Sequence, residues 1–481
     1  MEGAPKVFPP KFAESMRLAA EDMLQEVMQS VNDAPDGDWI SGSEEQVRDR
    51  FAVFREQAYQ AALQARIDAA EAAFPPPQTV QTDPVTQQPV TKRKRNKGKQ
   101  RTSRLTINGR VHLRRRWWHA AGDGSECPAD GFLAPPTEGV SRGVREMACR
   151  ENKDASGFAA AADNLARTAQ VKMSTEQLRQ VVEAEGLRVQ AAQDSGALPP
   201  AFRAEDCQVP GETTTRMYAG IDGVMVPTIT DAEKQQRRKK VNEKRRQRGR
   251  KCKPLPPRKK GTNNAWKEFK TVTFYNQDQS RRHLRLSRCR RPQTGVLVRR
   301  EAQQLGLSRA DEKVAIVDGA SWISQMLEGQ QHALQLDAVG LDFYHLSENV
   351  HKTRRAVFGE DAAGTQWADA LMHTFKHEGY EAAWDSLCQW RQPLRGGKRK
   401  AADRLINYVV DRREMINYPD FVRKQWDIGS GPTESRCKIA TRRLKSAGAR
   451  WNPANAEATA ALTTLDHSGQ WQQYWKLPTA A

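Results

Sequence analysis

The chain has 481 residues, of which 38% are hydrophobic, and a formal net charge of +19 at pH 7. This length predicts about three domains, and the charge predicts a polyanionic partner, with nucleic acid favoured over a ribosomal or membrane-surface role. The chain has seven cysteines but no Cys-x-x-Cys pair, which argues against a disulfide-stabilised protein and a zinc-thiolate site. Its start lacks the layout of a signal peptide and no apolar run is long enough to span a membrane, which argues against a secreted or membrane-spanning protein. We therefore expect a soluble, reduced intracellular protein.

Residues 1–74 are predicted to form a helical module. They are rich in Ala, Glu, Gln and Arg, and Val47, Phe51, Phe54 and Ala58 recur on one face of a helix. The pattern is typical of a helix that packs against a neighbour along one side.

Residues 75–104 are predicted to be a linker. The first part contains proline, glutamine and threonine without a hydrophobic cluster, and the basic run at 92–99 follows it. This run is either a solvated basic linker or an arm that contacts the DNA backbone. Nothing in the local sequence separates the two.

Residues 105–212 are predicted to form a DNA-binding region that begins with a β-hairpin, because Asn108-Gly109 is a strong hairpin turn within alternating residues. Residues 140–190 are predicted to be helical, and Ser174 with Gln177 forms a capping-box pattern. The last two helices can form a helix-turn-helix, although any helical hairpin gives the same pattern.

Residues 213–345 alternate between strands and helices. Strands are predicted at 218–227, 267–277, 283–290, 313–317 and 334–343, with a helix at 321–330 before the last strand. Three strands followed by strand, helix and strand is the order of a ribonuclease-H-like core.

A dense basic insertion at 231–262 separates the first two of these strands. Its like charges should repel one another, so it is predicted to be disordered when free, and to contact DNA or RNA unless it is a solvated insertion. The candidate nucleic-acid contacts in it are Arg237, Arg238, Lys239, Lys240, Arg245 and Arg246.

An all-helical insertion is predicted at 346–425, anchored by tryptophans. Residues 426–481 complete the core with a helix that begins near Pro432, runs to Ser446 and precedes a C-terminal tail. The expected fold class is therefore a multidomain α+β protein with an α/β catalytic core.

Three acidic residues end separate segments of this core, and each lies close to glycine, which lets the backbone turn sharply. They are Asp222, Asp318 and Glu434. Carboxylates gathered in a basic protein predict divalent metal chemistry on a phosphate backbone, because hard Mg²⁺ prefers oxygen ligands.

Four motifs carry a family resemblance: Asp222-Gly, Asp318-Gly-Ala-Ser-Trp-Ile, Leu341-Asp-Phe-Tyr-His and Gly429-Ser-Gly-Pro-Thr-Glu-Ser. In this order they resemble the motifs of Mutator-like DDE transposases, and most of all the bacterial ISKra-type insertion-sequence transposases. The resemblance covers about 214–460 and, more loosely, 104–190. It implies a ribonuclease-H-like catalytic domain with a helical insertion before the final Glu, in a cytoplasmic, nucleoid-associated bacterial protein.

The resemblance also implies the chemistry. Asp222, Asp318 and Glu434 would hold two Mg²⁺ ions, which Mn²⁺ can replace. Water would first cut the element end to expose a 3′-OH, which would then attack target DNA. The implied partners are duplex DNA, as terminal inverted repeats and as target, and a second copy in a homodimer or larger oligomer on DNA, with no membrane partner.

Asp342 is an alternative to Asp318, because it also follows an apolar strand. The family places a motif of Cys or Asp, two residues and His after the true second Asp, and Asp342 with His345 fits that motif. We therefore assign Asp318 to the metal, and Asp342 and His345 to a supporting role. The alternative for His345 is an ordinary histidine at a strand end.

Cations on the Glu434 helix are candidate DNA contacts. Lys438, Arg442 and Lys445 share a face with Glu434, unless they form a solvated helix face. Arg443, Arg450 and Trp451 could extend this surface, with Trp451 either stacked on a flipped base or buried in the core.

Two departures from the family pattern stand out. His119 and Cys127 lack the paired cysteines of a zinc-ribbon-like element, and the basic insertion is longer than usual. A catalytically inactive DNA-binding descendant and a stand-alone metal-dependent nuclease are the competing functions.

Overall fold

A computed structural model describes residues 8–82, 87–133, 139–258 and 263–477. The chain divides into two compact units, one ending at Val182 and the other running from Glu183 to Leu477. The boundary lies inside a helix, α5 (Thr175–Asp194), and not near residue 212 as predicted. The second half of α5 belongs to the larger unit because its side chains bond to that unit, as when Glu185 accepts a hydrogen bond from the Tyr474 hydroxyl at 2.7 Å.

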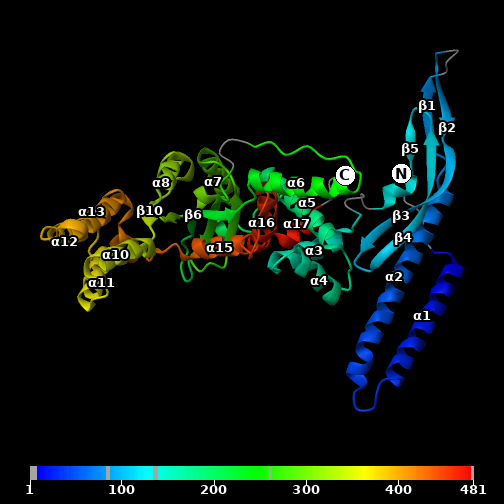
Figure 1. Ribbon diagram of the computed structural model, residues 1–481, viewed down its shortest axis with the longest axis horizontal. Helices are drawn as coiled ribbons and strands as arrows, with labels where there is room; N and C mark the ends of the chain where they lie inside the picture. The colour runs from blue at the N-terminus through cyan, green and yellow to red at the C-terminus, as the bar shows by residue number, and fades with distance from the viewer. Residues whose placement is uncertain (1–7, 83–86, 134–138, 259–262, 478–481) are drawn as a thin grey trace. The chain divides into compact units, whose positions relative to one another are not determined.

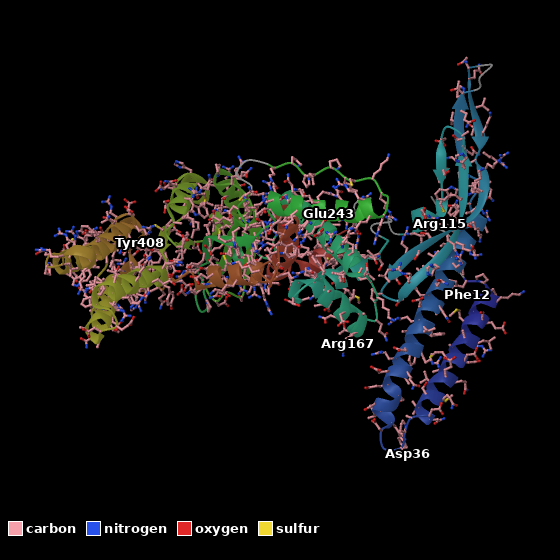
Figure 2. All side chains as sticks on the ribbon, in the orientation of Figure 1. Phe12, Asp36, Arg115, Arg167, Glu243 and Tyr408 are labelled. Carbon is pink, nitrogen blue, oxygen red and sulfur yellow. The ribbon has the colours of Figure 1, made fainter. Side chains whose placement is uncertain are left out.

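The first unit begins with a helical hairpin, α1 (Pro10–Asn32) and α2 (Trp39–Ala73). Half-buried residues of α1 at spacings of three and four, among them Met16, Met23 and Val27, form the stripe along which the helices pack. Asp36 lies at the closed end of the hairpin (Figure 2). The predicted helical module is confirmed.

The predicted linker is wrong for most of its length, because residues 75–104 contribute three strands. The basic run lies in β2 and β3, and β3 pairs with β4 in an antiparallel ladder whose turn residues are Ile107 and Asn108, so Gly109 is the first residue of β4. Tertiary pairing overrides the poor strand propensity of the lysines and arginines, as is common in sheets. The strands of this unit are β1 (Gln78–Thr82), β2 (Pro89–Arg93), β3 (Arg95–Thr106), β4 (Gly109–Ala120) and β5 (Gly124–Glu126).

The outer edge of β4 is covered by side chains of α2. Alternate backbone N–H groups of the strand donate to Glu or Gln side chains of the helix. Four residues of a helix rise about 6 Å and two residues of a strand about 6.8 Å, so the two repeats match over the first three bonds. The bonds are Arg110 to Glu56 (3.0 Å), His112 to Gln60 (2.6 Å), Arg114 to Gln64 (2.7 Å) and Arg116 to Glu71.

Helices complete the first unit. Ser174 accepts a hydrogen bond from the Gln177 amide at 3.1 Å, so this half of the predicted capping box is present. The helix-turn-helix stays a prediction. Besides the first part of α5, the elements are η1 (Pro128–Phe132), α3 (Arg142–Asp154) and α4 (Phe158–Thr168).

The second unit is built on a five-stranded sheet of order β10-β9-β6-β7-β8. The first three strands in the chain form an antiparallel meander, and β9 and then β10 add on the other side of β6 in parallel. All five strands were predicted, although β8 and β10 are shorter than expected. Their bounds are β6 (Arg216–Pro227), β7 (Trp266–Asn276), β8 (Arg282–Ser287), β9 (Glu312–Val317) and β10 (Ala338–Leu341).

Helices cover both faces of this sheet (Figure 1). Alternate residues of β6, such as Ala219 and Ile221, join one core with α7 and α8, whereas Tyr218 joins a cluster on the opposite face, where α15 packs. Among the described helices, none combines the length and hydropathy that a membrane span requires. These helices are α7 (Arg291–Leu305), α8 (Ser321–Glu328), α9 (Gln331–Leu334), α15 (Gly431–Arg442), α16 (Pro453–His467) and α17 (Trp471–Lys476), with turns η2 (Ala204–Asp206) and η3 (Leu307–Arg309).

The predicted helical insertion is confirmed, and it lies beyond the β10 edge of the sheet (Figure 1). Trp367 and Trp390 stack inside it with ring centroids 4.2 Å apart. Its elements are α10 (Phe343–Phe358), α11 (Ala362–His377), α12 (Tyr380–Arg391), α13 (Gly396–Val410), η4 (Arg413–Met415) and α14 (Tyr418–Arg423).

The basic insertion is a helix over much of its length, so the predicted disorder is wrong there. Helix α6 (Asp231–Gln247) starts with a capping box between Thr230 and Glu233. Acidic residues in its first turn and basic ones in its last turn complement the helix dipole, which offsets part of the like-charge repulsion. Residues 248–258 have no regular structure, and 259–262 lie outside the described residues.

A buried charge cluster ties this unit together, and it predicts acid sensitivity. Glu301 on α7 is fully buried and contacts His283 at 2.8 Å, Arg300 at 2.8 Å and Arg285 at 3.3 Å. Burial opposes its ionisation, but the hydrogen bond with His283 and the charge of Arg285 outweigh it and lower the pKa of Glu301 to about 2. A depressed carboxyl pKa stabilises the fold above the unfolded-state pKa and loses that stabilisation as pH falls.

We expect the free energy of unfolding to fall by about 3 kcal/mol between pH 4.5 and pH 2 through this group. Glu301→Gln should be destabilised by about 3 kcal/mol at pH 7 and should flatten the acid slope. Urea denaturation at several pH values measures both effects. Exposed Glu360, replaced in the same way, is the control, and an unchanged slope in Glu301→Gln would contradict the prediction.

Candidate active site

Three aspartates lie at equivalent positions of neighbouring parallel strands. Asp222 lies within β6, Asp318 directly follows β9 and Asp342 directly follows β10. The parallel registers pair Ala219 with Ala315, and Val317 with Leu341. Extended beyond the paired residues, these registers align Asp222 with Asp318 and Asp318 with Asp342. The sheet therefore brings the three carboxylates to one region.

Glu434 reaches this region from helix α15, in whose first turn it lies. The helix lies very close to β6, because a Cβ on Gly220 would be 1.8 Å from the Thr433 hydroxyl oxygen. That hydroxyl is 3.0 Å from the Thr273 hydroxyl of β7. One turn further along α15, the Cys437 thiol donates to Asp222 at 3.1 Å. A glycine on the central strand thus fixes the distance of the Glu434 helix from the sheet.

Asp342 is fully buried and uses its carboxylate oxygens within the protein. It accepts hydrogen bonds from the Tyr344 amide at 2.8 Å, from His345 Nδ1 at 2.8 Å and from the Ser430 hydroxyl. Burial opposes its ionisation, but the bonds from His345 and Ser430 hold the pKa of Asp342 below its ordinary value. Asp342 therefore joins β10 to the segment that leads into α15.

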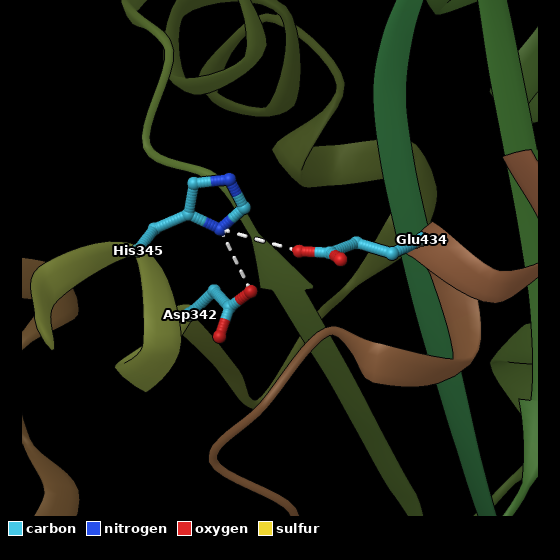
Figure 3. A group of neighbouring side chains, drawn as sticks. All are labelled: Asp342, His345 and Glu434. Carbon is cyan, nitrogen blue, oxygen red and sulfur yellow. Dashed lines mark hydrogen bonds and ion pairs between the residues drawn. The ribbon is translucent and has the colours of Figure 1, made fainter. Parts of the chain in front are cut away.

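His345 is a cation among these carboxylates. The hydrogen bond with Asp342 raises the pKa of His345 to about 9 against the effect of burial, with further contributions from Asp318 and Glu434. The imidazole is therefore protonated at neutral pH. Its Nδ1 atom is 3.7 Å from Glu434 Oε1, so it lies between the Asp342 and Glu434 carboxylates (Figure 3).

Asp318 is the half-buried carboxylate of this region with the fewest partners. It accepts one hydrogen bond, from the Ala320 amide at 2.8 Å. Burial and the negative charge of Asp222 raise the pKa of Asp318, whereas the charges of His345 and Arg412 oppose that rise. Two carboxylates that repel each other in a half-buried place are suited to share a cation.

The described residues contain one group of three side chains whose ligand atoms lie within 4.8 Å of one another and could hold a metal ion, namely Asp342, His345 and Glu434. The predicted trio of Asp222, Asp318 and Glu434 lies farther apart than this. Glu434 lies instead beside His345 and beside Lys438, whose Nζ is 3.8 Å from Glu434 Oε2.

The predicted DNA contacts of this region divide into exposed and buried residues. Lys438, whose side chain is 81% exposed, is joined at the surface by Arg442, Lys445 and Arg450. Helix α15 ends at Arg442 and not at Ser446 as predicted, so Lys445 lies beyond its end.

Arg443 and Trp451 are corrections, because both are buried and face the protein. The Trp451 indole donates to the Leu444 carbonyl at 2.9 Å, and the Arg443 guanidinium lies 5.1 Å from the Trp451 ring. Backbone bonds from Trp451 to Pro227 and from Ile229 to Trp451 attach this segment to the end of β6. The pair anchors the end of the Glu434 segment and does not extend a DNA surface.

Sequence reasoning missed three residues that shape the region. Ser430 holds Asp342, Cys437 holds Asp222, and Arg412 places its charge near Asp318. Cys437 follows Glu434 by three residues, so helical spacing places both on one face of the helix and could have identified Cys437 from the sequence. Arg412 comes from the far end of the helical insertion, and only the fold brings it beside Gly319, where a Cβ would lie 2.7 Å from its Nε atom.

No protein-family model matches the chain, and no curated protein matches it either.

Proposed function

We propose that residues 183–477 form the ribonuclease-H-like core of a DDE transposase. It would cut DNA at the ends of an insertion sequence and join the 3′-OH to target DNA. The strand order supports this, because an antiparallel meander extended by two parallel strands next to its first strand is the arrangement that this core requires. The helical insertion between Asp342 and Glu434 also agrees with the resemblance.

One observation carries the proposal. The registers align Asp222 on the central strand with Asp318 after the neighbouring strand, and Glu434 enters on a helix fixed to that same central strand at Gly220. Carboxylates on these three elements offer oxygen ligands to divalent cations from three sides. The alignment follows from the strand register, extended three residues beyond the last pair, Ala219 and Ala315.

The donor set fits Mg²⁺, with Mn²⁺ able to replace it. Asp222, Asp318 and Glu434 would hold two ions, which would neutralise charge on the attacking and leaving oxygens of the phosphodiester. The imidazole of His345 is a poorer ligand for Mg²⁺ than a carboxylate. We therefore assign Asp318, and not Asp342, as the second acidic ligand.

Asp342 and His345 would position the site. The carboxylate oxygens of Asp342 accept hydrogen bonds from His345, Ser430 and the Tyr344 amide. Asp342 would therefore fix the segment that leads into α15 and orient the imidazolium toward Glu434. The cation at His345 limits repulsion among the carboxylates before ions bind. Arg412 near Asp318 and Lys438 near Glu434 would hold the scissile phosphate.

The partners follow from the reaction. The protein would bind terminal inverted repeats and target DNA, in the bacterial cytoplasm at the nucleoid. Two ends have to be paired, so a homodimer or larger oligomer on DNA is part of the proposal. The exposed cations of α6 and α15 are suited to contact DNA near the site.

The proposal is tested by incubating the protein with DNA that contains the sequences flanking its own gene. With Mg²⁺ we expect cuts that leave 3′-OH ends and products joined to a target plasmid, and with EDTA neither. Cuts without joined products would indicate a stand-alone nuclease. Binding without cuts in either Mg²⁺ or Mn²⁺ would contradict the proposal and favour a DNA-binding protein.

A further inference from the structure

Six exposed cations lie along the β-hairpin of the first unit and the end of the strand before it. They share an absence of acidic partners: in the described part of the chain, none has a carboxylate oxygen within 4 Å. We name this set the cationic ribbon, and it consists of Lys92, Arg93, Arg95, Lys97, Arg101 and Arg114.

Other cations of the same strands are neutralised within the protein. Lys94 is buried and contacts both Asp123 and Glu126 at 2.8 Å. Lys99 contacts Asp68 of α2 at 2.6 Å. The fold therefore supplies counter-charges where the sheet needs them and leaves the cationic ribbon without them.

The register places like charges directly opposite each other. Arg101 faces Arg114 on the paired strand, and both belong to the cationic ribbon. Like charges in this position destabilise a sheet. A bound polyanion removes that penalty, so the ladder is more stable with such a partner than without one.

The shape of the hairpin favours duplex DNA. Each strand has 12 residues, a length of about 40 Å, which is close to one helical turn of duplex DNA, about 34–36 Å. The outer edge of β4 is covered by α2, so the ribbon is not free to pair with another strand there. Side chains project from the ribbon beyond Arg115 (Figure 2).

The helical hairpin of the same unit is acidic. Helices α1 and α2 contain six Lys or Arg and ten Asp or Glu, so the two helices together have a net charge of −4. Because the helical hairpin is acidic and the cationic ribbon is basic, positive charge is not spread evenly over the surface of this unit. The helical hairpin also supplies exposed cations for a matched control.

We propose that the cationic ribbon binds duplex DNA along its phosphate backbone, with its lysines and arginines on the phosphates. The proposal deepens the transposase function, on which the choice of DNA rests, by assigning DNA capture to an element of a different unit from the acidic site. Because this contact needs no metal ion, binding is expected to persist in EDTA.

The test compares two full-length variants that each lose four positive charges. The ribbon variant is Arg95→Gln, Lys97→Gln, Arg101→Gln and Arg114→Gln. The matched control is Lys11→Gln, Arg17→Gln, Arg48→Gln and Arg50→Gln on the acidic hairpin. Fluorescence anisotropy with a labelled 30-bp duplex in EDTA, over 50–300 mM KCl, gives the dissociation constant and its salt dependence.

We expect the ribbon variant to bind at least about tenfold more weakly at 100 mM KCl, and its log–log salt slope to fall by about 3 to 4. The control should match wild type. Single Arg101→Gln and Arg114→Gln variants, each expected to lower the slope by about 1, guard against misfolding of the fourfold variant.

Equal losses in both fourfold variants, or none in either, would overturn the proposal. Ribbon-dependent binding of duplex RNA or single-stranded DNA that is tighter than binding of duplex DNA would overturn the choice of duplex DNA. If ribbon binding holds but no cleavage is ever seen, the transposase function fails and the ribbon proposal stands.

Discussion

Replacing Asp222, Asp318 or Glu434 with its amide is expected to reduce Mg²⁺-dependent DNA cleavage by at least about a thousandfold. Each amide keeps the shape of the side chain and removes the negative charge that would hold a cation. Binding of duplex DNA in EDTA should not weaken, because removing negative charge lowers repulsion of phosphate. Initial rates on end-labelled DNA measure the first effect and anisotropy the second.

Asp427→Asn is the matched control for these variants. Asp427 is a half-buried carboxylate on the segment before α15, and its side chain accepts a hydrogen bond from Gln277 at 3.4 Å. We expect it to cleave DNA like wild type. Wild-type rates in Asp318→Asn together with loss in Asp342→Asn would move the second ligand to Asp342.

Gly220→Ala is expected to damage both stability and activity. The added Cβ would lie 1.8 Å from the Thr433 hydroxyl oxygen and 2.6 Å from the Thr273 hydroxyl oxygen, so α15 would have to move away from β6. Overpacking of this kind costs about 1–3 kcal/mol. We expect a loss of this size in urea denaturation, and at least about a hundredfold loss of cleavage because Glu434 moves with the helix.

Two further variants separate this effect from a general effect of alanine. Gly397→Ala on α13 adds a Cβ with nothing within 4 Å, so stability and cleavage should be retained. Gly220→Ala combined with Thr433→Ala removes the closest contact and should recover part of the stability. A Gly220→Ala protein that unfolds and cleaves like wild type would show that the spacing of α15 does not matter.

The elements of residues 183–477 could be predicted from sequence more completely than those of the first unit. Short apolar runs ended by Asp222 and Asp318 mark strands buried on both faces, and Pro432 marks the first turn of the Glu434 helix. These signals are local, so no tertiary information is needed to find them. The helical insertion could be predicted from the sequence for the same reason.

The remaining features depend on tertiary contacts. Residues 95–104 form a strand only because β4 pairs with them, and Trp451 is buried only because it attaches to β6. Helix α5 spans the boundary between units, which no change in composition marks. The position of Glu434 beside His345 joins residues far apart in sequence, and spacing could not predict it.

The most direct test of the account is Mn²⁺ binding, followed by electron paramagnetic resonance during titration of the protein without DNA. It separates an all-carboxylate centre from the Asp342, His345 and Glu434 group. The account predicts that Asp222→Asn and Asp318→Asn lose most of the binding, whereas His345→Gln retains it. Loss of binding in His345→Gln with wild-type binding in Asp222→Asn and Asp318→Asn would contradict it and place the metal at the histidine.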